Sequence, residues 1–232
     1  MRLEDLNWMD VESYLRRDDR LLLVLGACEQ HGYLSLATDS KIPLALADAA
    51  SERTNILVAP PLAFGCSPYF AAYPGTISLR LNTYLGVVED VVRSVHSHGF
   101  RGLMILNGHG GNTGARVLLD ELVNELEGLR VGWYAWWQAP RVIQVAESHG
   151  LKPYHGGWIE AFRFTRVAPL PQGEKGEIQS PEILPAGAVR EHYGDGVFGG
   201  PYSVDMQIMD QVFAVAVEDI VAELEGLRAG SR

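Results

Sequence analysis

The chain has 232 residues, of which 47% are hydrophobic and 21% are charged, and its formal net charge is −10. This length fits one large α/β domain, and the composition is ordinary for a globular protein. The negative charge argues against a nucleic-acid or anionic-membrane partner, because both select clustered Lys and Arg. Two cysteines, a charged N-terminal segment and the lack of an apolar run of about 20 residues favour a cytoplasmic protein with no membrane span.

The N-terminal half alternates helix patterns with the apolar runs of buried strands. A loop rich in Gly, Pro and aromatic residues occupies 65–76, and loops of this length are often functional. The expected elements are a helix over 3–17 with Asp10 as its N-cap, a strand at 21–25, a helix over 42–53 capped by Ser40, strands at 56–59 and 77–81, and a helix from 82 to Gly99.

The C-terminal half continues this alternation. Residues 168–203 are rich in Gly, Pro and charge, which predicts an extended excursion over the surface. Strands that alternate with helices predict a single three-layer α/β/α domain over residues 1–232, with a mostly parallel central sheet. The expected elements are strands at 100–106 and 131–137, and helices over 113–126, over 141–148, from the segment 154–160 to about 165, and over 204–227.

One histidine lies in a glycine turn between a predicted strand and a predicted helix. The segment 107–112 reads NGHGGN and places His109 just beyond the apolar run 103–106. In a parallel sheet, the carboxyl end of a buried strand delivers side chains into a crevice, and flanking glycines leave room beside the imidazole. Alternatively, the segment is a tight strand-to-helix turn in which the histidine is incidental.

Other acidic residues and histidines share this placement, since each follows a predicted strand or begins a helix near glycine. Such positions converge on one edge of a parallel sheet. Two imidazoles and three carboxylates suit Zn²⁺, Mn²⁺ or Fe²⁺, and five ligands suit two ions bridged by a shared carboxylate. Singly, each residue could instead be a helix cap, a satisfied buried histidine or a surface residue. The candidate ligands are Glu29, His31, Asp39, His109 and Glu160, with His155 nearby.

Aromatic residues lie near these candidate ligands in the sequence. Trp158 is two residues from Glu160, and we expect it to line the substrate pocket together with Tyr33 and Phe70. Aromatic side chains of this kind form an apolar wall for a flat substrate. Trp133 lies within the predicted strand 131–137 and is more simply explained as a core residue.

Four motifs of the chain resemble those of the creatininase (creatinine amidohydrolase) family, in the family's order and over nearly the whole chain. The resemblance implies an α/β/α fold, a two-metal site, a homo-oligomer that is commonly a hexamer, and hydrolysis of a non-peptide or cyclic amide C–N bond. The motifs are EQHG at 29–32 with Thr38 and Asp39, YPGT at 73–76, the run from His98 to Asn112, and HGG at 155–157 with Glu160.

The resemblance also implies a role for each candidate residue. Asp39 would bridge the two metal ions. His155 would be a catalytic residue that shuttles a proton or contacts the substrate, with the catalytic Glu160 beside it. The other ligands would divide between the ions, with Glu29 and His109 on one and His31 and Glu160 on the other.

Several positions depart from the family pattern. Tyr33 begins a segment that replaces the family's His-Leu-Pro, and Phe70 stands where many members have histidine. Gly111 replaces an acidic residue of creatininases proper, and Ala161 and Phe162 replace the usual Thr-Ser. These departures argue against creatinine as the substrate.

Together, these observations predict a metal-dependent amidohydrolase that cleaves a C–N bond of a small amide, of cyclic amide or formamide type, with a metal-activated water. One alternative is a peptidase of the same family that trims a modified peptide. A second is a non-catalytic metal-binding assembly protein. The cofactors predicted for the enzyme are two divalent metal ions, Zn, Mn or Fe.

Overall fold

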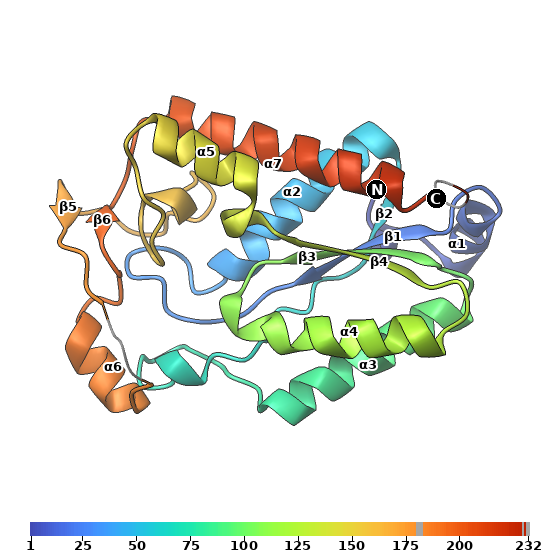
Figure 1. Cartoon of the computed structure of the whole chain (residues 1–232), viewed down its shortest axis with the longest axis horizontal. Helices are drawn as coiled ribbons and strands as arrows, with labels where there is room; N and C mark the ends of the chain where they lie inside the picture. The colour runs from blue at the N-terminus through green and yellow to red at the C-terminus, as the bar shows by residue number, and fades with distance from the viewer. Residues whose placement is uncertain (180–182, 229, 231–232) are drawn as a thin grey trace.

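A four-stranded parallel sheet with the strand order β2-β1-β3-β4 forms the centre of the computed structural model, which describes residues 1–179, 183–228 and 230 (Figure 1). Every residue of β1 and β3 is buried, as expected for the continuous apolar runs of a sheet that is covered on both faces. The predicted parallel sheet is therefore confirmed. The strands are β1 (Arg20–Leu25), β2 (Leu57–Val58), β3 (Gly102–Asn107) and β4 (Arg130–Ala135).

Helices cover both faces of this sheet, which gives three layers (Figure 1). Alternate residues of β1 enter different cores: Leu22 and Val24 pack beneath one group of helices, whereas Leu21 and Leu23 pack against the other. This follows from the two-residue period of a strand. One layer holds α2 (Thr38–Thr54), α5 (Pro140–Ser148) and α7 (Met206–Gly226), and the other holds α3 (Leu81–Ser97) and α4 (Gly114–Glu125).

The strand order places a crevice at the carboxyl ends of β1 and β3. From β1 the chain first adds β2 on one side, and β3 then pairs with the other side of β1. Leu25 is in register with Asn107, so the segments that follow these two strands leave the sheet side by side. In open α/β sheets, ligands bind at such a reversal of strand order.

Two predicted elements are wrong. Residues 77–81 form no strand: Ile77 makes a single bridge with Cys28, which lies in an irregular segment that offers no longer edge to pair with. The predicted helix to residue 165 is one 3₁₀ turn, Trp158–Glu160, followed by turns. There the Thr165 hydroxyl donates to the carbonyl of Glu160 at 2.6 Å, and such local side-chain bonds compete with helix formation.

Two helix starts also differ from the prediction. The N-cap of α1 (Trp8–Leu15) is Asn7, whose side chain accepts from two backbone N–H groups, and Asp10 is its partner in a capping box. The segment before it forms a separate 3₁₀ turn at Leu3–Asp5. Helix α2 begins at Thr38, without a side-chain cap, so Asp39 lies in its first turn.

The excursion over 168–203 contains regular structure that sequence patterns did not indicate. It holds β5 (Glu174–Lys175), α6 (Ala186–Tyr193) and β6 (Gly200–Pro201), and β5 pairs with β6 in antiparallel fashion. Figure 1 shows these elements beyond one end of the central sheet. The part of the predicted excursion at 180–182 lies outside the described residues. Within the described part of the chain, no helix is long and apolar enough to cross a membrane.

Candidate metal centre

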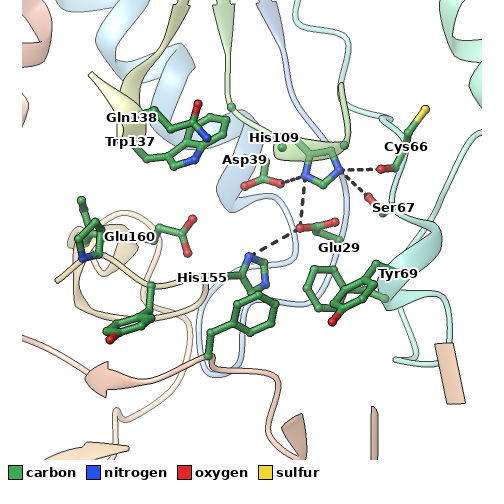
Figure 2. Close-up of a pocket in the computed structure, with 18 of the residues that line it drawn as sticks. Glu29, Asp39, Cys66, Ser67, Tyr69, His109, Trp137, Gln138, His155 and Glu160 are labelled. Atoms are coloured by element: carbon green, nitrogen blue, oxygen red, sulfur yellow. Dashed lines mark hydrogen bonds and ion pairs between the residues drawn. The ribbon is translucent and has the colours of Figure 1, made fainter. Parts of the chain in front are cut away.

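Five side chains that are distant in the sequence meet at the carboxyl edge of the sheet. Each is at most 8% exposed. Together they form two sets of three whose ligand atoms lie within 4.8 Å of one another, and Asp39 belongs to both sets. The structure therefore brings together all five predicted ligands. Glu29 and His31 follow β1, Asp39 comes from α2, His109 follows β3, and Glu160 ends the 3₁₀ turn Trp158–Glu160. Figure 2 shows four of these side chains, Glu29, Asp39, His109 and Glu160, around one cavity.

Backbone carbonyls orient both imidazoles. His109 donates from Nε2 to the carbonyl of Cys66 at 2.8 Å, which leaves Nδ1 3.0 Å from Oδ2 of Asp39 and 3.3 Å from Oε1 of Glu29. His31 donates from Nδ1 to the carbonyl of Glu29 at 3.1 Å, and its Nε2 lies 2.8 Å from Oδ1 of Asp39. Such outer hydrogen bonds set the tautomer of a metal-binding histidine.

The atoms that face the centre have the properties of metal ligands. Oε2 of Glu29 is buried without a hydrogen-bond partner, and Nε2 of His31 and Oδ2 of Asp39 are buried and face only the other charged groups of the centre. Buried polar atoms without partners are costly, and a cation placed between them would satisfy all three. Imidazole nitrogens and carboxylate oxygens bind Zn²⁺, Mn²⁺ and Fe²⁺. The residues present therefore fit divalent metal ions.

The protein without metal carries protons where cations would bind. Burial opposes charge on His31, but the carboxylates of Asp39 and Glu160 raise its pKa to about 10. Burial likewise disfavours a charge on His109, but hydrogen bonds from its ring to the carboxylates of Asp39 and Glu29 raise its pKa to about 11. Burial raises the pKa of Glu160 to about 7, against the opposing effect of His31. Protons on the two imidazoles thus offset part of the negative charge of the carboxylates.

His155 lies on the wall beside the five ligands and is held by aromatic rings. The ring of Phe70 stacks on it, with centroids 4.6 Å apart and an interplanar angle of 16°, and the ring of His31 lies 4.4 Å away. Its Nδ1 faces Oε1 of Glu29 at 3.9 Å. Burial and the nearby charge of His31 hold the pKa of His155 well below its ordinary value, so the imidazole is neutral.

Gln30 is a site residue that the sequence interpretation missed. Its side-chain nitrogen lies 2.9 Å from Nε2 of His155 and donates to the carbonyl of Gly196 at 3.1 Å. The carbonyl of Gln30 is 3.0 Å from the same Nε2. These contacts anchor one ring nitrogen of His155 and leave the other toward the cavity. The position of Gln30 between Glu29 and His31 was the signal that could have identified it.

The glycine turn after β3 has two positions that exclude a side chain. A Cβ on Gly108 would overlap the carbonyl oxygen of Asp39, and one on Gly111 would overlap that of Cys66 and lie 2.5 Å from Nε2 of His109. By contrast, a Cβ on Gly110 would meet no atom within 4 Å. The room that was predicted beside His109 is therefore real.

Of the three residues predicted to line the substrate pocket, one lies in the cavity and two do not. Phe70 lines a cavity of about 800 Å³ above the ligands. Trp158 does not: it is 0% exposed within the core, where its Nε1 donates to the carbonyl of Lys152 at 2.9 Å. Tyr33 is also absent from the lining and packs edge-on against Tyr202, because the segment after β1 turns its ring away from the centre. Trp133 packs against the core as expected.

Comparison with known proteins supports one family. A family profile described as creatinine amidohydrolase matches residues 4–224. The chain is 30% identical over 175 residues to a creatinine amidohydrolase of Pseudomonas putida, covering 67% of each chain. It is 29% identical over 226 residues to a mycofactocin precursor peptide peptidase of Mycobacterium ulcerans, covering 88% of this chain and 84% of the relative. A crystal structure of a creatinine amidohydrolase matches with a TM-score of 0.83 at 24% identity, over 98% of each chain.

Proposed function

Because the chain belongs to the creatinine amidohydrolase (creatininase) family, a family of hydrolases, we propose that it uses two divalent metal ions to hydrolyse a C–N bond of a small amide, of cyclic amide or formamide type. The observation that carries this proposal is the pair of buried ligand sets that share Asp39. Two closely spaced ions held in this way are typical of hydrolases that activate water and polarise the bond to be cut.

The distances between the proposed ligands divide them between two ions. Glu29 and His109 would hold one ion, and His31 and Glu160 would hold the other. Asp39 would serve both ions, which its geometry supports: Oδ2 lies 3.0 Å from Nδ1 of His109, and Oδ1 lies 2.8 Å from Nε2 of His31. The donor set suits Zn²⁺, Mn²⁺ or Fe²⁺.

In the proposed reaction, His155 moves the proton. When bound, divalent cations lower the pKa of a coordinated water and polarise an amide carbonyl. His155 is neutral and presents Nδ1 to the cavity, so it can accept a proton from the attacking water and deliver it to the departing nitrogen. The Gln30 carbonyl, which accepts from Nε2–H of His155 at 3.0 Å and so leaves Nδ1 without a proton, and the stacked ring of Phe70 keep the imidazole in this orientation.

The substrate is proposed to differ from creatinine. Gly111 offers no acidic group, and Phe70 occupies a position where many family members have histidine. A second candidate function is trimming of a modified peptide, which is favoured by similarity to the mycobacterial peptidase over 88% of this chain. We further propose that the protein is a homo-oligomer of the cytoplasm, as the family assignment suggests.

Metal analysis and a substrate panel test this proposal. Protein loaded with Mn²⁺ or Zn²⁺ and then desalted should contain about two ions per chain. The loaded protein should hydrolyse formamides or cyclic amides, with creatinine and short peptides as the comparison substrates. Protein without bound metal after loading would contradict the enzymatic function. Two bound ions without turnover of any substrate would instead favour the non-catalytic assembly protein.

A further inference from the structure

The walls of the cavity differ in chemistry from its floor. The floor holds the carboxylates and histidines of the candidate metal centre, whereas the walls above it are aromatic and aliphatic. The wall residues come from distant parts of the chain: Tyr69 and Phe70 from the 3₁₀ turn Pro68–Phe70, Trp137 from the 3₁₀ turn after β4, Tyr193 from α6, and Tyr154, Ile143 and Phe198 from other segments.

Two of these aromatic side chains lie on opposite sides of the metal centre. Figure 2 shows Trp137 on one side of Asp39 and His109 and Tyr69 on the other. Gln138, next to Trp137, supplies a neutral amide at the same wall. A flat apolar group that extends from a bond held at the floor would therefore contact aromatic rings. Pockets of this volume enclose molecules considerably larger than a simple amide group.

The described residues of the walls offer no cationic side chain to pair with an anionic group. Among the described residues that line the cavity, none is Lys or Arg. The lysines near the walls are engaged elsewhere, since Lys152 pairs with Glu177 at 2.7 Å and Lys175 pairs with Asp195. Burying an unpaired charge is far more costly than burying an apolar ring. This composition selects against anionic substituents.

We propose that this cavity recognises amides that carry an uncharged aromatic group, with the ring held between the walls that Trp137 and Tyr69 form. The inference rests on the proposed function only for the bond that is cut. The recognition itself is a property of the walls and can be measured as binding, without turnover.

The test compares N-benzylformamide with N-methylformamide on manganese-loaded protein, by calorimetric binding and by hydrolysis. N-benzylformamide should bind at least about tenfold more tightly, the gain expected for burying one aromatic ring. Trp137→Ala should reduce this advantage by about three- to tenfold. The matched control is Trp8→Ala, because Trp8 is 72% exposed on α1, at the other end of the sheet from β5 and β6 (Figure 1). It should leave the advantage unchanged.

A second pair of ligands tests charge at constant shape. N-benzylformamide with a para-sulfonate should bind at least about tenfold more weakly than the derivative with a neutral para-methylsulfonyl group. Equal binding of these two would overturn the selection against anions. Equal binding of the benzyl and methyl formamides, or equal effects of Trp137→Ala and Trp8→Ala, would overturn aromatic recognition.

The two levels of the proposal can fail separately. Hydrolysis of N-methylformamide without any benzyl preference would refute aromatic recognition and leave the amidohydrolase function intact. Binding of N-benzylformamide that depends on Trp137, with no hydrolysis of either formamide or of the cyclic amides in the substrate panel, would support aromatic recognition and contradict the proposed function.

Discussion

Replacement of Asp39 by asparagine tests the shared carboxylate of the metal centre. Asp39 contributes one oxygen to each of the two ligand sets, so Asp39→Asn removes a charged ligand from both ions at once. The substitution keeps the side chain's shape, and Asp39 lies in the first turn of α2, where an amide is tolerated. We therefore expect the variant to fold and to lose both metal ions.

The expected loss of metal affinity follows from the ligands that each ion would keep. After the substitution, one ion retains Glu29 and His109, and the other retains His31 and Glu160. Loss of even an outer partner costs about 10- to 100-fold in metal affinity, so loss of a direct ligand should cost at least about 100-fold at each ion. A matched variant, Glu160→Gln, removes a ligand from one set only and should release one ion.

Elemental analysis of desalted protein distinguishes these outcomes. Wild type should hold about two ions per chain, Glu160→Gln about one and Asp39→Asn close to none. Far-ultraviolet circular dichroism should match in all three proteins, which checks that they are folded. Retention of one fully occupied site in Asp39→Asn would refute the bridging role, and the reasoning from the two ligand sets with it.

Three further predictions concern protons and space at the same site. His155→Ala should leave metal content unchanged while turnover falls by about 10²- to 10⁴-fold, and metal loss would instead make His155 a ligand. Because the pKa values of His31 and His109 are raised to about 10 and 11 in the metal-free protein, and that of Glu160 to about 7, metal loading at pH 7 should release two protons from the histidines and part of a third from Glu160, so affinity should increase as the pH rises toward the histidine values. Calorimetry in buffers of different ionisation enthalpy measures this release, and a heat that is independent of the buffer would rule it out. Gly108→Ala should lower the free energy of unfolding by about 1–3 kcal/mol, in chemical denaturation, because its Cβ would overlap the carbonyl of Asp39. Gly110→Ala, which meets no atom within 4 Å, is the control, and equal effects would contradict the packing argument.

Much of the centre could be predicted because it depends on local patterns. The all-apolar runs of β1 and β3 identify strands that are buried on both faces, and polar residues directly after such strands collect at one sheet edge. That rule was sufficient to group Glu29, His31 and His109 with two more distant carboxylates. Where patterns were short or the chain was held by side-chain bonds, as at 77–81 and at Thr165, the predictions were wrong.

The sequence by itself determined the four strands of the central sheet, the metal-binding residue types and the family, because apolar periodicity, glycine turns and motif order are written along the chain. Only the tertiary structure decided where side chains point. It placed Trp158 in the core and Trp137 in the cavity, and it set the Cys66 carbonyl against His109. These contacts join segments far apart in the chain, and the direction of a side chain in a turn has no sequence period from which it could be predicted.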